Sequence, residues 1–251
     1  MRTVIIVQAR MTSTRLPGKV LANLAGRPML GQELARLRRC RHAQEIVVAT
    51  TTNATDDAVV ALAEKEGVRW FRGDEHDVLS RYLGAARAAR AEVVVRVTAD
   101  CPLIEPALVD EVVRALTGDG PTPEPADYAS NIQHRTFPRG LDVEALHMDV
   151  LERVGRLGRT KEAREHVTFF IHREHPELFL LRSVTGSEDH SDLRWTVDEP
   201  ADLDLVRRIY EIAGLGVGSG ARELDFGELV TLVRAHPELA RLNAHVQQVH
   251  A

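Results

Sequence analysis

The sequence predicts an α/β fold with a mostly parallel central sheet and helices on both faces. Over residues 1–117, four short apolar segments rich in β-branched side chains alternate with four longer amphipathic segments. Successive β-α units with short connections form parallel sheets covered by helices. Each apolar segment also ends in polar residues, which parallel strands gather at one edge, where open α/β folds bind their ligands.

The elements of the first half follow from hydrophobic periodicity and from helix start and stop signals. The strands are short apolar runs, expected at residues 4–7, 46–50, 68–71 and 93–97. The helices have apolar side chains at helical spacing and are expected at about 28–41, 53–66, 78–90 and 107–117. Pro28 suits the first turn of the first helix, and Gly67 suits the end of the second.

The second half follows a Gly- and Pro-rich loop at residues 118–126 and has a more mixed pattern. Strands are expected from Tyr128 to about Asn131 and over 141–145, 178–184 and 193–198. Helices are expected at about 148–157, 161–174, 200–212 and 226–235. A flexible connection at 214–220 and a polar C-terminal tail complete the chain.

Composition excludes several functional classes. A chain of 251 residues with 44% hydrophobic residues can bury one full core. Its formal net charge of −5 gives no broadly basic surface for nucleic acid, and 4% aromatic residues offer few stacking platforms. No stretch is long and apolar enough for a membrane span, and no signal peptide pattern is present. We therefore expect a soluble, cytoplasmic protein. Cys40 and Cys101 provide no disulfide framework.

The loop after the first strand, residues 8–19, is the clearest functional feature. It combines two arginines, one lysine, small hydroxyl residues and a Pro-Gly turn, although the chain has only three lysines among its 32 basic residues. Such a loop suits a polyanion such as a triphosphate; solvated loop charges are the alternative. The P-loop pattern fails, because Ser13 replaces its first glycine and Val20 follows Lys19. The dinucleotide-binding glycine pattern is also absent, since Gly18 is the first glycine.

Two aspartates form a second feature. Asp100 and Asp198 each follow an apolar run and stand two residues before a proline. Carboxylates at strand ends are suitable ligands for Mg²⁺, which also binds substrate phosphates. Each aspartate could equally serve as a structural cap, so the pattern alone leaves both roles open.

These segments resemble a known family. The pattern A-R-x-x-S-x-R-L-P-G-K at residues 9–19 resembles the N-terminal signature of the sugar-acid cytidylyltransferases, which include the CMP-Kdo and CMP-acylneuraminate synthetases, and above all their spore-coat polysaccharide biosynthesis branch. The patterns T-x-D-x-P-L-I at 98–104 and W-T-V-D-x-P-x-D-L at 195–203 resemble the family's metal-aspartate motifs, although Ala99 stands where glycine is expected. Residues 72–82 are also similar to the spore-coat branch.

The resemblance covers about residues 1–210 and implies a Rossmann-like nucleotidyltransferase sandwich with a small inserted lid or dimerisation element. The chain would be a single domain, with a nucleotide-binding half at 1–117, an acceptor and dimerisation half at 127–212, and a C-terminal extension at 213–251. It also implies a homodimer that acts on CTP and a small sugar-acid-like acceptor, with no nucleic acid or membrane as partner.

The implied reaction transfers CMP from CTP to a sugar acid or related acceptor by Mg²⁺-dependent in-line attack on the α-phosphate, with release of pyrophosphate. The catalytic charges would be Arg10, Arg15 and Lys19, and the metal ligands Asp100 and Asp198. The implied nucleotide contacts are Gln8, Ala9, Arg10, Ser13, Lys19, Arg72, Asp74, Arg81 and Thr98. The implied acceptor contacts are Asn131, Arg139, Asp142, Glu144, Glu165, His166, Arg194 and Trp195.

Some alternatives stay open at this point. The acceptor segments could instead form a dimer contact. A nucleotide-sugar-dependent glycosyltransferase could be built on a similar nucleotide-binding half, and a non-catalytic homologue could bind CTP without turnover. The H-E-x-x-H and G-x-S-x-G patterns of metalloproteases and serine hydrolases are absent. The sequence fixes neither the acceptor nor the base preference.

Overall fold

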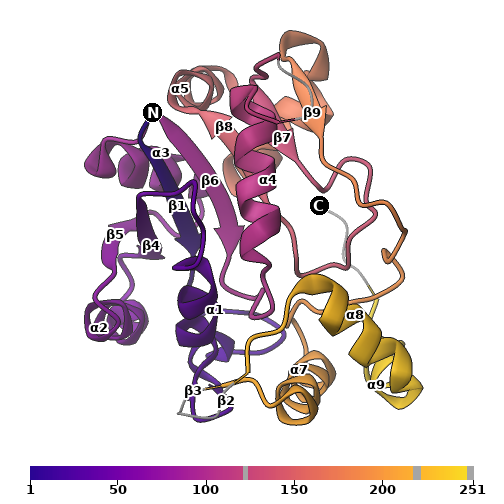
Figure 1. Cartoon of the computed structure of the whole chain (residues 1–251). Helices are drawn as coiled ribbons and strands as arrows, with labels where there is room; N and C mark the ends of the chain where they lie inside the picture. The colour runs from indigo at the N-terminus through magenta and orange to yellow at the C-terminus, as the bar shows by residue number, and fades with distance from the viewer. Residues whose placement is uncertain (121–123, 217–221, 248–251) are drawn as a thin grey trace.

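The computed structural model describes residues 1–120, 124–216 and 222–247, and it places a mixed seven-stranded sheet between two layers of helices (Figure 1). Four strands of the first half lie in the order β5-β4-β1-β6 and run parallel. They are β1 (Thr3–Gln8), β4 (Glu45–Thr51), β5 (Arg69–Gly73) and β6 (Val93–Thr98). The prediction of a mostly parallel sheet with helices on both faces is confirmed.

The second half extends the same sheet. Strand β8 (Glu144–His147) pairs antiparallel with β6, β7 (Tyr128–Ser130) pairs antiparallel with β8, and β9 (Leu181–Ser183) pairs parallel with β7. The strand predicted at 141–145 therefore begins later than expected. The strand predicted at 193–198 is wrong, because this segment forms only an isolated bridge between Arg139 and Arg194.

Alternating strand residues supply the two cores that the helices cover. Ile5 and Val7 of β1 face one core, whereas Val4 and Ile6 face the other. The first core packs against α1 (Met29–Leu37), α2 (Asp57–Lys65), α4 (Pro106–Thr117), α7 (Pro200–Ala213) and α8 (Phe226–Ala235). The second packs against α3 (Val78–Ala89), α5 (Met148–Leu157) and α6 (Lys161–His166).

Two predicted helices differ from the structure. A hairpin of β2 (Asn23–Leu24) and β3 (Arg27–Pro28) precedes α1, so Pro28 lies before the helix and not in its first turn. The helix predicted at 161–174 is interrupted after α6, because Val167 has a φ of +54°. A π-helical segment, Phe170–Glu174, and a 3₁₀ turn, Pro176–Leu178, follow.

The C-terminal extension contains a helix that the sequence pattern does not predict, α9 (Pro237–Leu242). Parts of the predicted loops at 118–126 and 214–220, namely residues 121–123 and 217–220, lie outside the described residues, as do residues 248–251 of the predicted tail. Within the described ranges, the helices are all too short or too polar to cross a membrane.

Candidate active site

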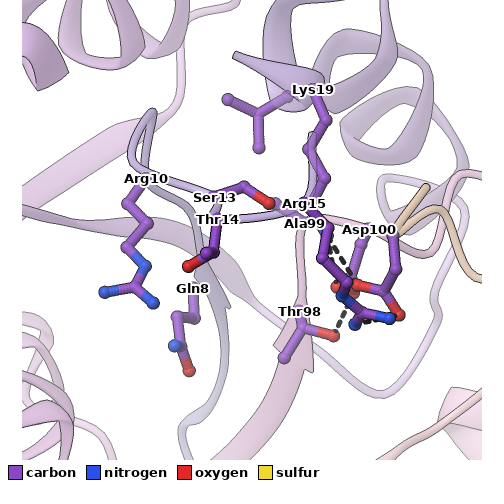
Figure 2. A pocket seen from close by; sticks show the side chains of 11 residues that line it. Gln8, Arg10, Ser13, Thr14, Arg15, Lys19, Thr98, Ala99 and Asp100 are labelled. Atoms are coloured by element: carbon purple, nitrogen blue, oxygen red, sulfur yellow. Dashed lines mark hydrogen bonds and ion pairs between the residues drawn. The ribbon is translucent and has the colours of Figure 1, made fainter. Parts of the chain in front are cut away.

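A cavity of about 260 Å³ lies at the carboxyl ends of β1 and β6, at the sheet edge that the sequence indicates (Figure 2). It brings together the loop after β1 and both predicted metal aspartates. Its lining residues are Gln8, Arg10, Ser13, Thr14, Arg15, Lys19, Val20, Thr98, Ala99, Asp100 and Asp198.

The loop is held in shape by backbone contacts and by one buried aspartate. Gly18 has a φ of +73°, and its N–H donates to the carbonyl of Met11 at 2.9 Å. The Met11 N–H in turn donates to Oδ1 of Asp56 at 2.8 Å. Burial raises the pKa of Asp56, but hydrogen bonds from Thr51, Met11 and Thr50 outweigh burial and hold the pKa below its ordinary value. Asp56 is therefore an anion that fixes the start of the loop.

Lys19 joins the two aspartates. Its ammonium donates to Oδ2 of Asp100 at 3.0 Å and to Oδ1 of Asp198 at 2.9 Å. It also donates to the carbonyl of Val197 at 2.7 Å, so all three of its protons are engaged. Burial lowers the pKa of Lys19, but the charges of Asp100 and Asp198 outweigh burial and raise the pKa above its ordinary value. The ammonium stays charged.

Each aspartate has a second set of contacts. Thr98 donates its hydroxyl to Oδ1 of Asp100 at 2.6 Å. Burial raises the pKa of Asp100, but Lys19 and Thr98 outweigh it, so the pKa is lowered and the carboxylate stays ionised. Oδ2 of Asp198 lies 3.2 Å from Nη2 of Arg15 and 2.9 Å from Nη2 of Arg194.

The other side of the cavity carries less charge. Figure 2 shows Gln8 and Arg10 pointing away from the group formed by Lys19, Arg15 and Asp100. Nη1 of Arg10 lies 3.4 Å from Oε1 of Glu75. Oε1 of Gln8 is buried and has no hydrogen-bond partner among the described residues. This amide oxygen is available to a donor on a bound molecule.

Four residues predicted to contact the nucleotide do not line this cavity. Ala9 is buried beside β4, and Arg72 donates to the carbonyls of Thr51 and Asn53. Asp74 accepts from backbone N–H groups of its own turn, and Arg81 is fully buried and donates to the carbonyl of Asp74. Their contacts with a nucleotide stay predictions.

A second cavity, of about 570 Å³, lies beside the first along β6. Arg96 lines the second cavity and Thr98 lines the first, and side chains two residues apart on a strand share a face. Arg139, Glu144 and His166 of the predicted acceptor set line it. Its full lining is Arg96, Ile132, Gln133, His134, Arg135, Arg139, Glu144, His166, Thr168, Phe169, His172, Arg173 and Leu181.

The carboxylates at this second cavity are already engaged. Glu144 forms an ion pair with Arg96 and accepts hydrogen bonds from Tyr128 and Thr168. Burial raises the pKa of Glu144, but Arg96 outweighs burial and lowers the pKa, so Glu144 stays ionised.

Nearby Asp142 accepts two hydrogen bonds from Arg135, at 2.6 and 2.9 Å. Arg139 and Arg173 have no ion pair with any described residue, so the cavity carries excess positive charge.

The remaining predicted acceptor residues lie elsewhere. Asn131 is buried and bonds to the backbone of Leu141 and Val143. Trp195 is 1% exposed in the core, and Arg194 contacts Asp198 and Asp202. Glu165 lines neither cavity. Asp142 also lines neither cavity, and acceptor contacts by these five residues stay predictions.

Some residues at the site are not predicted from sequence to have a role there. Arg96 is the only charged residue in the apolar run 93–97, and that position is a signal that could have found it. Asp56 reads in the sequence only as part of a capped helix start. The non-glycine residues with positive φ in the described ranges are Ala25, Arg90 and Val167, so Ala99 replaces the expected glycine without left-handed backbone.

Comparisons with known proteins agree with the geometry. Residues 4–219 match the family model described as Cytidylyltransferase. The chain is 32% identical over 242 residues to the spore coat polysaccharide biosynthesis protein SpsF of Bacillus subtilis, covering 94% of this chain and 95% of that protein. It is 39% identical over 111 residues to a 3-deoxy-manno-octulosonate cytidylyltransferase of Geobacter sulfurreducens, covering 44% of each chain.

Solved structures share the fold. A cytidylyltransferase from Leptospira borgpetersenii matches the whole of both chains with a TM-score of 0.88 and 30% identity. CMP:2-keto-3-deoxy-manno-octonic acid synthetase, complexed with CTP, matches 84% of this chain and 99% of its own with a TM-score of 0.64 and 20% identity. The match of the family model over most of the sequence and the full-length relatives show that the chain belongs to the cytidylyltransferase family, and it is a nucleotidyltransferase.

Proposed function

We propose that the chain transfers CMP from CTP to a sugar acid or a related anionic acceptor and releases pyrophosphate, in a step of polysaccharide biosynthesis. The observation that carries this proposal is the meeting of Lys19, Asp100 and Asp198 at the edge where Arg15 and Ser13 also line the cavity. A triphosphate needs several cationic contacts and an ionised metal site, and this cavity offers both.

The donor set fits Mg²⁺. One oxygen of Asp100 and one of Asp198 lie within 3.0 Å of the same ammonium nitrogen, so two carboxylates converge on one point. The described residues contain no cluster of three or more His, Cys, Asp or Glu side chains suited to a metal. Mg²⁺ usually binds through one or two carboxylates and completes its shell with phosphates and water. Held by these two carboxylates, next to the ammonium that they share, it would neutralise phosphate charge and polarise the α-phosphate.

The protein side chains would position the reactants and neutralise charge. Lys19 would neutralise triphosphate charge while its three protons hold Asp100, Asp198 and the Val197 carbonyl. Arg15 and the loop N–H groups would contact the phosphates, and Ser13 would orient them. An acceptor hydroxyl attacks the α-phosphorus in line, its O–P bond forms, and the bond to the bridging oxygen breaks as pyrophosphate leaves. Such a step requires little covalent chemistry from the protein, so positioning and electrostatic stabilisation dominate.

The less charged side of the cavity, whose Arg10 is paired with Glu75, suits the nucleoside. The buried Oε1 of Gln8 lacks a donor among the described residues, and the cytosine amino group or a ribose hydroxyl would supply one. Arg10 stands beside it, held by Glu75 on the surface of the site. We therefore place the base and ribose next to Gln8, and the phosphates next to Lys19.

The second cavity suits the acceptor. Its lining carboxylate, Glu144, is paired with Arg96, whereas Arg139 and Arg173 have no ion pair with described residues. Three histidines also line the cavity. A negatively charged acceptor would balance this charge, and the Geobacter relative is named for such a sugar acid. Residues 1–117 would then serve mainly the nucleotide and 127–212 the acceptor. A cytoplasmic homodimer is part of the proposal, and sedimentation of the purified protein tests the dimer.

Pyrophosphate release and ligand-induced stabilisation test the proposal. The melting temperature of the protein is measured with CTP, UTP, ATP or GTP, each with and without Mg²⁺. Pyrophosphate release by the native protein is then assayed with a panel of sugar acids. A ligand at about 100 times its Kd stabilises the fold by roughly 2.7 kcal/mol. We expect a Mg²⁺-dependent shift with CTP and pyrophosphate release only with an acidic acceptor.

Two outcomes would contradict the proposal. Stabilisation by UDP-sugars and not by CTP would favour the glycosyltransferase alternative. CTP binding without pyrophosphate release for any acceptor would favour a non-catalytic homologue.

A further inference from the structure

The C-terminal extension reaches the proposed metal site through one amide side chain. Asn243 directly follows α9 and is 4% exposed. Its Nδ2 donates to Oδ1 of Asp202 at 2.8 Å and to the backbone carbonyl of Arg194 at 3.1 Å. Figure 1 shows α8 and α9 beside α7, the helix that begins at the end of the Asp198 segment.

Asp202 connects this amide to Asp198. It is fully buried, and its Oδ2 accepts the backbone N–H groups of Asp198 and Glu199, both at 3.0 Å. It also accepts two hydrogen bonds from Arg194, at 2.9 and 3.1 Å. Nη2 of the same Arg194 lies 2.9 Å from Oδ2 of Asp198. The position of Asp198 therefore depends on Asp202 through both its backbone and its side chain.

These contacts set which oxygen of Asp198 points toward Asp100 and the proposed metal site. Arg194 and Arg15 lie against Oδ2, so Oδ1 is left toward Lys19, where it converges with Asp100. If Asp202 shifted, Arg194 could follow it and the carboxylate of Asp198 would rotate. Groups behind a metal ligand that fix its orientation commonly change metal affinity or activity by about 10- to 100-fold when removed.

The amide lies outside the part of the chain that the family model matches, which ends at residue 219. The apolar contact that holds α9 is separate from the amide, because Leu239 is 1% exposed and belongs to the main core. The two contributions can therefore be removed one at a time.

We propose that Asn243 is a positioning residue for Asp198, acting through Asp202 and Arg194, so that the C-terminal extension helps to shape the triphosphate and metal site. This inference rests on the proposed role of Asp198 in holding Mg²⁺ on the nucleotide. Through these two residues, the extension would influence how much Mg²⁺ increases the affinity for the nucleotide.

The test compares CTP affinity with Mg²⁺ and with EDTA, measured by calorimetry on the full-length protein without acceptor. In Asn243→Ala we expect the Mg²⁺-dependent gain in CTP affinity to fall about tenfold, while affinity in EDTA is unchanged. Asn243→Asp should lose more of the gain, because it places a second carboxylate against Asp202. In both variants, the kcat should decrease along with the Mg²⁺-dependent gain in CTP affinity.

Two control variants separate the possible explanations. Leu239→Ala loosens α9 without removing the amide, and it should lower the melting temperature while the Mg²⁺-dependent gain stays within twofold of wild type. If Asn243→Ala behaves like Leu239→Ala, the positioning role is wrong. Asp198→Asn should abolish the gain; if it does not, the proposed metal site itself is wrong, whatever Asn243 does.

Discussion

The two cavities beside β6 balance charge in opposite ways. In the first cavity, proposed for the nucleotide, Lys19 and Arg15 already contact carboxylates, including Asp198. In the second cavity, the lining carboxylate Glu144 is paired with Arg96, and Arg139 and Arg173 have no ion pair with described residues. The first cavity therefore provides its own counter-ions, as a site for phosphate and a cation requires. The second has excess positive charge that a ligand would have to balance.

The largest effect is expected from removing one cation of the first cavity, which we call the balanced cavity because its cations and carboxylates pair with one another. Lys19→Ala removes the ammonium that joins Asp100 and Asp198, and it leaves two half-buried carboxylates without their common partner. We expect turnover, measured as pyrophosphate release, to fall by about 100- to 1,000-fold. Lys65→Ala on the exposed face of α2 is the matched control and should retain normal turnover. Wild-type turnover in folded Lys19→Ala would remove the catalytic assignment.

A smaller effect is expected from removing an unpaired arginine of the second cavity, the unbalanced one. Arg139→Ala should raise the KM for an acidic acceptor about 10- to 100-fold, because a hydrogen bond to a charged group contributes roughly 1.5–3 kcal/mol. The KM for CTP should not change, since Arg139 does not line the nucleotide cavity. Arg139→Lys should recover part of the loss, and Arg159→Ala on the exposed surface is the control. An equal rise in both KM values would show that the two cavities do not divide the substrates.

The smallest effect is expected at Asp56, which holds the start of the loop that lines the balanced cavity. Asp56→Asn should cost about 1–3 kcal/mol of stability at pH 7, because Asp56 is buried and accepts four hydrogen bonds, including one from Met11. The folded protein lowers the pKa of Asp56 below its ordinary 3.8. The unfolded chain therefore binds more protons in acid, and this contribution, present above about pH 4, is lost as the pH falls further.

Urea unfolding at pH 7 and pH 3 measures this difference. The difference in the free energy of unfolding between wild type and Asp56→Asn should be smaller at pH 3 than at pH 7. Asp57→Asn, whose carboxylate is exposed, should have nearly the wild-type free energy of unfolding at either pH. A gap of equal size at both pH values would argue against an ionised Asp56.

The balanced cavity was the more predictable of the two from sequence. Its cations stand close together in one loop, and Asp100 follows β6 at the edge where that loop begins. The run before Asp198 is not a strand, but the Val197 N–H donates to the Asp100 carbonyl and brings Asp198 to the same edge. The second cavity is built from residues 96 to 181, on strands, loops and a π-helical segment. Only three of the eight predicted acceptor residues line it, because no local pattern joins these segments.

The incorrect elements have physical reasons. Leu193, Trp195 and Val197 alternate as in a strand, and all three are buried. The pattern therefore predicted burial correctly, but the backbone of this segment forms only one bridge and no strand. The helix is interrupted after α6 at Val167, which has a positive φ. Positive φ is unfavourable for a β-branched residue, so the sequence gives no signal for a break at this position. Asn243 carries no periodic signal, since its role depends on Asp202 from a distant segment.

The two cavities lie on one strand but have no lining residue in common. Arg96 faces one and Thr98 the other, so β6 fixes their spacing while separate segments form their walls. In evolutionary terms, the proposed division of substrates would let replacements at Arg139, His166 or Arg173 adapt the chain to a new acceptor without changing the residues that line the first cavity. A duplicated gene of this kind could change its product while keeping its nucleotide chemistry intact.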